Sequence, residues 1–292
     1  TSVRLHSTDQ GFALAATALT VPAYADDHKG MSKAEHDKMH KAHQDRLAKI
    51  LVDPSRAEDS KRDKYRHPAE TFDFFRLHPD HVIGEYAPGG EWVSRILGRY
   101  VDEKGKYVGL FFGTKTHFSD TAKEGIKAGI AKFPADVAAV SGRPATDFSA
   151  FSLSEAPEGT KGTFDRIIVM RMLHNMQRWN IADAEIKAMR DLLKDDGLLG
   201  IEQHRAKADA PYSYADGKNG YLREADVIKF MEVNGFELVG KSEINANPKD
   251  EANWPDGVWT LPPRLAKGET DKAKYEAIGE SDRMTLLFKK RP

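Results

Sequence analysis

Short apolar runs alternate along the chain with segments in which apolar residues recur at helical spacing. The runs, which are typical of buried strands, lie at 82–86, 107–112, 137–140, 164–172, 198–203, 236–244 and 284–288. Apolar residues at helical spacing predict helices at 68–75, 93–100, 121–133, 181–193 and 223–234. We expect Gly197, in the left-handed conformation, and Gly235 to end the last two of these helices.

This alternation predicts a Rossmann-like α/β fold, with a seven-stranded, mostly parallel sheet and helices on both faces. The last two strands are separated by a polar stretch at 245–280 that contains no convincing helical pattern. We therefore expect these two strands to form an antiparallel hairpin at one edge of the sheet. The stretch itself is long for a connection, which favours either a functional lid or a docked excursion.

Two segments precede the predicted domain, which we place at 66–292. The first, at 1–25, contains a short apolar run that ends in Ala23-Tyr24-Ala25, as in a secretory signal with its cleavage site. Its apolar run is too short to span a bilayer. This interpretation predicts a periplasmic or secreted protein. The alternative is an apolar terminal strand or helix that docks on the domain.

The second segment, at 26–65, is dense in charge and poor in large apolar residues. It contains one predicted exposed helix at 34–52, which Pro54 ends. His36, His40 and His43 share one face of this helix, and imidazoles suit copper or zinc. We favour the simpler alternative, a solvated charged helix that is rich in histidine. Either this extension or the stretch at 245–280 could contact a protein partner.

Composition excludes several classes of function. The chain has 292 residues, of which 40% are hydrophobic and 30% charged, as expected for one large soluble domain with additions. Its formal net charge of −1 lacks the basic excess of a nucleic-acid binder. There is no cysteine, which excludes disulfides, thiolate metal ligands and cysteine nucleophiles.

The strongest chemical signal is the turn that follows the strand at 82–86. The strand carries Glu85, and Ala87, Gly89 and Gly90 lead into a helix that starts near Val93. This order places backbone amides and a helix N-terminus at the carboxyl end of a strand, where α/β proteins usually bind ligands. The turn lacks the G-x-G-x-x-G pattern of dinucleotide-binding enzymes. We expect a small-molecule ligand at this position.

Six segments together resemble a family of exported bacterial class I methyltransferases that depend on S-adenosylmethionine (SAM). The segments are 66–70 (RHPAE), 85–92 (EYAPGGEW), 164–165 (FD), 194–197 (KDDG), 202–205 (EQHR) and 233–236 (VNGF). The resemblance covers about residues 55–292. It implies the class I methyltransferase fold, SAM as cofactor and methyl transfer to an acceptor that the sequence does not identify.

The resemblance also implies a set of cofactor contacts, namely Glu85, Ala87, Gly89, Gly90 and Asp147, the last of these against adenine. The chain departs from the family in two respects. Ala87 and Glu91 replace glycines of the turn, and the strand at 107–112 is not followed by the acid that binds ribose. A second interpretation therefore stays open. In it, the fold is catalytically silent and binds a ligand or another protein in the periplasm.

Candidate catalytic residues follow the fourth and fifth predicted strands. His174 and His204 could each take a proton from the methyl acceptor, while Asn175 and Arg205 could bind the substrate. With His117, which follows the second strand, the two histidines could alternatively bind a metal. The simplest alternative is that each histidine only makes hydrogen bonds within its loop.

Overall fold

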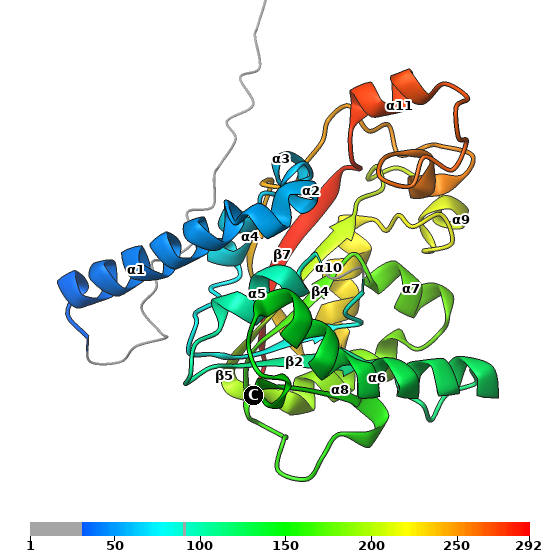
Figure 1. Ribbon diagram of the computed structural model, residues 1–292. Helices are drawn as coiled ribbons and strands as arrows, with labels where there is room; N and C mark the ends of the chain where they lie inside the picture. Colours follow the sequence, from blue (N-terminus) through cyan, green and yellow to red (C-terminus); the bar gives the residue numbers. More distant parts are fainter. Residues whose placement is uncertain (1–30, 90–91) are drawn as a thin grey trace, which may run out of the picture.

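A computed structural model describes residues 31–89 and 92–292, and its centre is one seven-stranded sheet with the order β3-β2-β1-β4-β5-β7-β6 (Figure 1). Strands β1 to β5 run in parallel, whereas β7 is antiparallel to both β5 and β6. The strands are β1 (Val82–Tyr86), β2 (Lys106–Phe111), β3 (Phe148–Ser152), β4 (Phe164–Met170), β5 (Leu193–His204), β6 (Phe236–Ser242) and β7 (Arg283–Lys290). This is the predicted Rossmann-like arrangement, with the strand order of class I methyltransferases.

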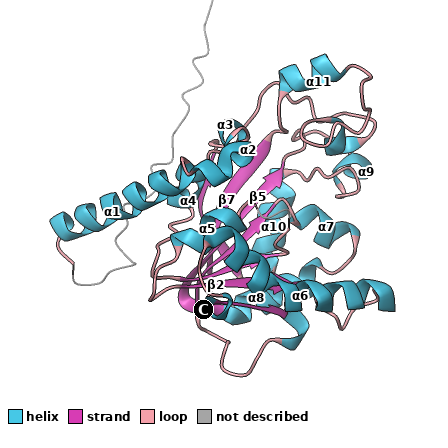
Figure 2. Cartoon of the chain, in the orientation of Figure 1, coloured by secondary structure: helices cyan, strands magenta, loops and turns pink. Residues whose placement is uncertain are grey.

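Helices flank the sheet on both sides (Figure 2). They are α1 (Lys33–Leu51), α2 (Ala57–Ser60), α3 (Asp63–Arg66), α4 (Pro68–Phe74), α5 (Ser94–Tyr100), α6 (Asp120–Ser141), α7 (Leu173–Arg178), α8 (Ala182–Leu192), α9 (Tyr212–Ala215), α10 (Glu224–Val233) and α11 (Lys272–Ile278). Among the described residues, no helix is long and apolar enough to cross a membrane.

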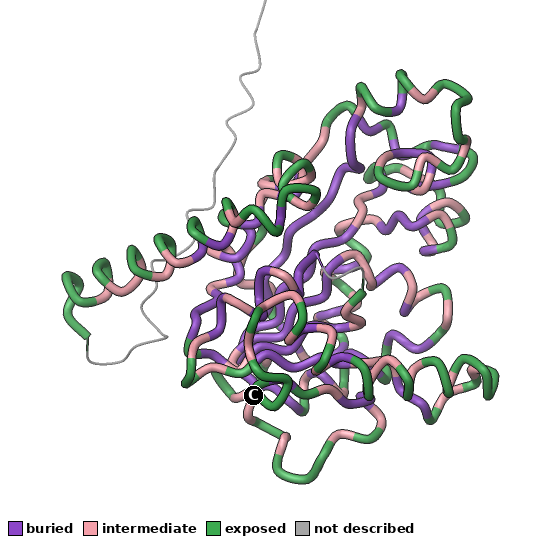
Figure 3. The backbone as a smooth tube through the Cα atoms, viewed as in Figure 1, coloured by how far each residue is buried: buried purple, intermediate pink, exposed green. Residues whose placement is uncertain are grey.

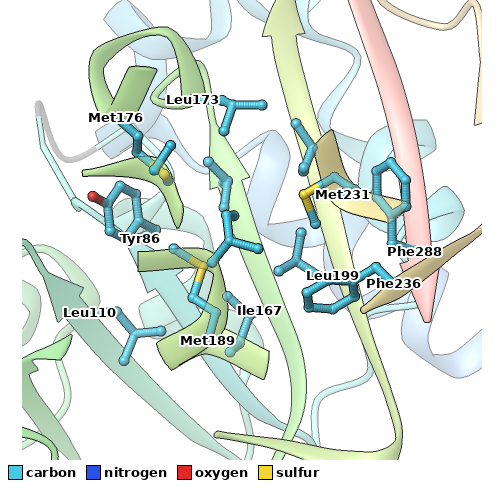
Figure 4. Packing of buried hydrophobic residues seen from close by; sticks show 14 of the residues in the cluster. Tyr86, Leu110, Ile167, Leu173, Met176, Met189, Leu199, Met231, Phe236 and Phe288 are labelled. Carbon is cyan, nitrogen blue, oxygen red and sulfur yellow. The ribbon is translucent and has the colours of Figure 1, made fainter. Parts of the chain in front are cut away.

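The central strands bury both of their faces, because successive side chains point to opposite sides of a strand. In β4, Ile167 and Val169 pack into one core with α7, α8 and α10 (Figure 4). Ile168 and Met170 pack into the other core, which α1, α4, α5 and α6 cover. Burial on both faces explains why these strands read as continuous apolar runs rather than as alternating ones.

The predicted strand at 137–140 is wrong, because α6 continues through it to Ser141. Phe133 and Val137 are four residues apart and are both buried, so the run belongs to the inner face of a helix. The third strand is β3, which starts only at Phe148.

The predicted left-handed end at Gly197 is also wrong. Helix α8 stops at Leu192, and Leu193 already has an extended backbone. Gly197 lies within β5, where a Cβ atom would come within 2.9 Å of the carbonyl oxygen of Phe164. The glycine is needed for this close approach. Gly235, with φ of 83°, follows α10 as predicted.

Helix α1 confirms the predicted helix of the N-terminal extension, and Ser32 caps it. It is not exposed along its whole length (Figure 3), because Leu47 and Ile50 are buried in the core beside α4 and α5. The signal-like segment at 1–25 and the turn residues Gly90 and Glu91 lie outside the described residues. Cleavage and export therefore stay predictions, and N-terminal sequencing of exported protein should begin at Asp26.

The polar stretch at 245–280 is a docked excursion with a small core of its own, and it contains the helix α11 that the sequence pattern did not predict. Trp254, Leu261 and Tyr275 pack there against Tyr221. Buried Asp250 organises the cluster, since it accepts hydrogen bonds from the Tyr221 hydroxyl and the Trp254 indole. The excursion places Trp259 and the prolines at 262–263 above the sheet, next to the ends of β5 and β7.

Candidate functional site

The turn after β1 has its tightest point at Ala87, which adopts a left-handed φ of 49°. Its amide donates to the carbonyl oxygen of Leu110 at 2.7 Å, so the turn is fastened to β2. A left-handed conformation is unusual for a residue with a side chain and is often found at functional sites. Gly89 is exposed, and among the residues that the structure describes an added Cβ would meet the Ala87 carbonyl oxygen at 3.7 Å, which is an ordinary contact.

Glu85 is buried inside the fold rather than exposed at the turn. Its carboxylate is buried and accepts a short hydrogen bond from the Tyr107 hydroxyl, which also pairs with Ser94 Oγ at 2.9 Å. Burial raises the pKa of Glu85 to about 7, while the Tyr107 hydrogen bond and the charge of Arg171 oppose the rise. Glu85 thus joins β1, β2 and α5 beneath the turn.

A carboxyl group does lie at the end of β2, but it comes from helix α8. Glu185 accepts the Gly113 amide at 2.9 Å, just after the strand. The side chain is buried, and burial raises its pKa to about 7 against the opposing effect of that amide. No sequence motif marks this residue, because its role depends on the packing of the first turn of α8 against the loop after β2.

Next to the turn, a pocket of about 210 Å³ opens at the carboxyl ends of β4 and β5. Its wall is formed by the loops before α4, after β4 and after β5, and by the excursion. The residues that line it are Arg62, Arg66, Arg171, His204, Val258, Trp259, Leu261, Pro262, Pro263, Arg264, Glu280 and Ser281. One of these residues connects the pocket to the segment after the turn, since the Arg66 guanidinium lies 4.8 Å from the ring centre of Trp92.

The pocket is positively charged, because four arginines and one carboxylate line it. That carboxylate, Glu280, pairs with Arg62 at 2.8 Å and with Arg66 at 3.0 Å. Arg171 is held from below by buried Glu202, at 2.6 Å. Such fixed guanidinium groups match the geometry of carboxylates and phosphates. The arrangement suits an anionic ligand.

The two predicted base candidates lie together beside the arginines. The ring centres of His174 and His204 are 5.6 Å apart. His174 Nδ1 lies 3.3 Å from Gln203 Oε1 and donates to it, which leaves Nε2 as the acceptor nitrogen. His204 Nδ1 lies 2.6 Å from Ser281 Oγ. Of the two rings, only His204 lines the pocket, and His174 packs behind it.

Both imidazoles are uncharged at neutral pH. Burial lowers the pKa of His174 to about 4, and the charges of Arg178 and Arg171 add to the effect. The pKa of His204 is also held well below its usual range, mainly by burial and then by His174 and Arg283. An anion bound among the arginines would raise both pKa values towards neutrality, because an opposite charge favours the protonated ring.

Aromatic side chains border the same edge of the sheet. Phe112, which follows β2, makes an edge contact with Trp179 at 5.3 Å, and Phe118 lies 5.8 Å from the same indole. The guanidinium of Arg178 lies between the rings of Trp179 and Trp259, at 5.0 and 5.6 Å from their centres. These rings connect the end of β2 to the positive pocket and offer flat surfaces for stacking.

Asn175 fits the role predicted for it only in part. Its Nδ2 donates to Met172 Sδ at 3.3 Å. Its Oδ1 is buried and, within 31–89 and 92–292, accepts no hydrogen bond. A buried acceptor that lacks a donor is costly unless a ligand supplies one. Asn175 therefore stays a candidate for ligand binding.

Two predicted site residues do not reach the site. Asp147 precedes β3, so it lies at the amino edge of the sheet, where it pairs with Arg143 at 2.9 Å. The sequence pattern placed the third strand before Asp147, whereas β3 follows it, so the residue was assigned to the wrong edge of the sheet. Arg205 is held by three carboxylates, Asp282, Glu243 and Glu224, at 3.0, 2.7 and 3.2 Å. Arg205 does not line the pocket, whereas Arg171 does.

The three histidines of α1 do not form a metal site by themselves. His40 Nε2 lies 2.6 Å from Asp73 Oδ1, and the His43 ring lies against His78. Within the described part of the chain, the one group with the spacing of metal ligands consists of His78, Asp80 and His81.

Comparison with known proteins gave a result at the level of the fold. A scan of protein-family profiles and a search of curated proteins found no match to this sequence. Among solved structures, a SAM-dependent methyltransferase from Aquifex aeolicus is similar, with 15% identity, a TM-score of 0.43 and coverage of 68% of this chain and 93% of that one.

Two further similar structures belong to proteins with different activities. The [4+2]-cyclase SpnF has 16% identity and a TM-score of 0.46, over 77% of this chain and 80% of that one. The trans-methyltransferase CalH, solved with SAH, has 15% identity and a TM-score of 0.42, over 84% of this chain and 62% of that one. At such identities the likeness concerns the fold, and function must be argued from the site.

Proposed function

We propose that this protein binds SAM at the carboxyl edge of its sheet and transfers the methyl group to an acceptor that carries an anionic group. The observation that carries the proposal is the positive pocket at the carboxyl ends of β4 and β5, with the uncharged His204 in its wall and Arg66 against Trp92, which follows the turn after β1. The strand order, which is that of class I methyltransferases, supports the same conclusion.

The residues around the turn fit the cofactor. The space above Gly89 would let the methionine part approach the backbone. The unpaired Asn175 Oδ1 could accept a hydrogen bond from its amino group, and Glu185 supplies the carboxyl near the end of β2 that β2 itself lacks. When bound, SAM supplies an electrophilic methyl group.

The chain's own residues would then orient the acceptor and receive its proton. Arg171 and Arg66 would hold the anionic group of the acceptor and so fix its position relative to the turn. As the acceptor atom gains the methyl group and loses its proton, His204 Nε2 would accept that proton. Ser281 orients the His204 ring through its bond to Nδ1, and Trp259 covers the pocket.

Isothermal titration with S-adenosylhomocysteine tests cofactor binding without knowledge of the acceptor. We expect micromolar binding to the full chain, and binding about tenfold weaker or worse for Asn175→Ala because a hydrogen bond to a charged group is lost. Asn253→Ala, which alters an exposed asparagine of the excursion, is the matched control and should bind as the parent does. No binding at millimolar ligand would contradict the proposal.

Methyl transfer itself is tested with a panel of small alcohols, phenols and amines that each carry a carboxylate or phosphate group, by measuring release of S-adenosylhomocysteine. His204→Gln should lower turnover by about 100-fold or more while it leaves cofactor affinity unchanged. Equal turnover of the variant and the parent would exclude His204 as the base.

A second candidate is a protein of the same fold that binds an anion and has no catalytic activity. The buried position of Glu85 favours it, because this acid is committed to Tyr107 instead of facing a ligand. This candidate predicts that carboxylates or phosphates bind the pocket although S-adenosylhomocysteine does not. The titrations above therefore separate the two functions.

A further inference from the structure

A second cluster of polar side chains lies at the opposite edge of the sheet from the pocket, in the turn between α4 and β1. His78 and His81 are buried there, whereas Asp80 between them is exposed. One ligand atom from each of these three side chains lies within 4.8 Å of the other two. The turn is fixed on its far side, since the Asp102 amide donates to the Pro79 carbonyl oxygen at 2.8 Å.

Helix α1 brings a further imidazole to this turn. The ring centres of His43 and His78 are 4.8 Å apart, and those of His78 and His81 are 4.5 Å apart. Arg46, one helical turn further on, donates to the backbone carbonyl oxygens of Tyr100 and Arg99 at 2.7 and 2.9 Å. The position of His43 is therefore set by the docking of α1.

Carboxylates lie near this cluster as well. His43 and His78 line a groove of about 330 Å³ between α1 and α4, together with His40, Glu70 and Asp73. Tyr100, at its base, has a pKa raised first by burial and then by Asp73, while Arg46 opposes the rise and Asp80 adds the smallest effect. The negative charge of these groups favours a bound cation.

We propose that His78, Asp80 and His81, with His43 as the fourth ligand, bind a divalent transition-metal ion of the zinc class. Two or three imidazoles with one carboxylate form a donor set that such ions prefer, and alkaline-earth ions do not. The inference is independent of the proposed methyl transfer. The site joins the N-terminal extension to the domain, so the bound ion would act as a clamp on α1.

Coordination requires the ligand atoms of His78, Asp80 and His81 to approach one another, and His43, whose ring centre lies 4.8 Å from that of His78, to turn towards them. Ligands at about 2.0–2.1 Å from a tetrahedral zinc ion are roughly 3.3 Å from one another, which is closer than the present upper limit of 4.8 Å. Coordination through His81 Nδ1 would replace its weak hydrogen bond from the His78 amide, at 3.3 Å. Exposed Asp80 can rotate towards the two buried imidazoles, which would exchange present contacts for the ion.

Calorimetric titration of the full chain with zinc chloride, purified without a histidine tag, tests the site. We expect one ion per chain with micromolar or tighter affinity. His78→Gln and His81→Gln should each weaken binding by ~10-fold or more, because they remove a ligand. His117→Gln, which removes an exposed imidazole at the other edge of the sheet, is the matched control and should bind as the parent does.

Two further variants keep the test decisive if a buried histidine is needed for folding. Asp80→Asn alters an exposed side chain, and His43→Gln alters the ligand on α1, so both should fold and both should weaken zinc binding. X-ray absorption of the zinc-loaded chain should show two or three imidazole ligands. Parent-like affinity in all four variants, or no binding by the parent at 100-fold molar excess of zinc, would overturn the proposal.

Discussion

Burial changes the chemistry of Glu85, an acid that the sequence alone places next to a ligand. Its carboxyl is enclosed between β1, β2 and α5, and its pKa is raised to about 7. The folded protein therefore binds this proton between about pH 4.5 and 7, where the unfolded chain has released it. As a consequence, stability from this group is present below pH 4.5 and is lost as the pH rises through 7.

Glu85→Gln should remove this dependence, because the amide keeps an acceptor for Tyr107 and carries no charge. We expect the variant to match the parent at pH 4 and to exceed its free energy of unfolding at pH 8 by up to ~3 kcal/mol. Urea denaturation at both pH values measures the difference. Glu103→Gln, at an exposed acid, is the control and should depend on pH as the parent does. If pH changed the stability of the parent and of Glu85→Gln equally, the pKa of Glu85 would not be raised by burial.

At the scale of elements, α1 is the clearest case of a segment whose role depends on its contacts. Most of its residues are charged or polar, as in a solvated helix. Leu47 is nevertheless only 5% exposed and packs in the same core as Phe72 and Tyr100. The guanidinium of Arg46 satisfies carbonyl oxygens at the end of α5. These contacts hold the extension on the domain.

Leu47→Ala should therefore lower the free energy of unfolding by about 2–5 kcal/mol, as for a leucine in a well-packed core. Val52→Ala, five residues later at a side chain that is 80% exposed, should change it by no more than about 0.5 kcal/mol. Chemical denaturation of the full chain measures both. If the two variants proved equally stable, α1 would not be docked as described.

At the scale of the whole molecule, one buried carboxylate joins distant parts of the chain. Glu280 accepts from Arg62, which precedes α3, from Arg66 at the end of α3, and from Arg283 in β7. Arg283 also lies 3.1 Å from Glu202 in β5, and Glu202 pairs with Arg171. This network holds the N-terminal segment, the excursion and the positive pocket in one arrangement.

Glu280→Gln should cost about 3–5 kcal/mol of stability, because it leaves buried guanidinium groups without their counter-charge. It should also weaken anion binding less than Arg171→Ala does, since the arginines themselves remain. Glu276→Ala, at an exposed acid of α11, is the control. Urea denaturation is the suitable measurement, because guanidinium salts would screen the ion pairs of the network. A free energy of unfolding of Glu280→Gln within about 1 kcal/mol of the parent would show that the network does not hold these segments together.

The sequence by itself determined the fold class, six of the seven strands and the turn after β1, because apolar periodicity and glycine placement are local properties. It missed β3, since a helical face rich in valine and alanine also reads as a short apolar run. It predicted that His174 and His204 lie at one edge of the sheet, and the structure places them there with ring centres 5.6 Å apart, because the carboxyl ends of β4 and β5 meet at that edge. Their catalytic role stays a prediction.

Only the tertiary structure decided which charged side chains stay available to bind a ligand. Arg205 is occupied by three carboxylates, while Arg171 lines the pocket, and the two cannot be told apart from their neighbours in sequence. Glu185 reaches the end of β2 from a distant helix, and His43 meets His78 only because α1 docks beside α4. Pairing, burial and pKa depend on which atoms come together in space, and those contacts join residues far apart in the chain.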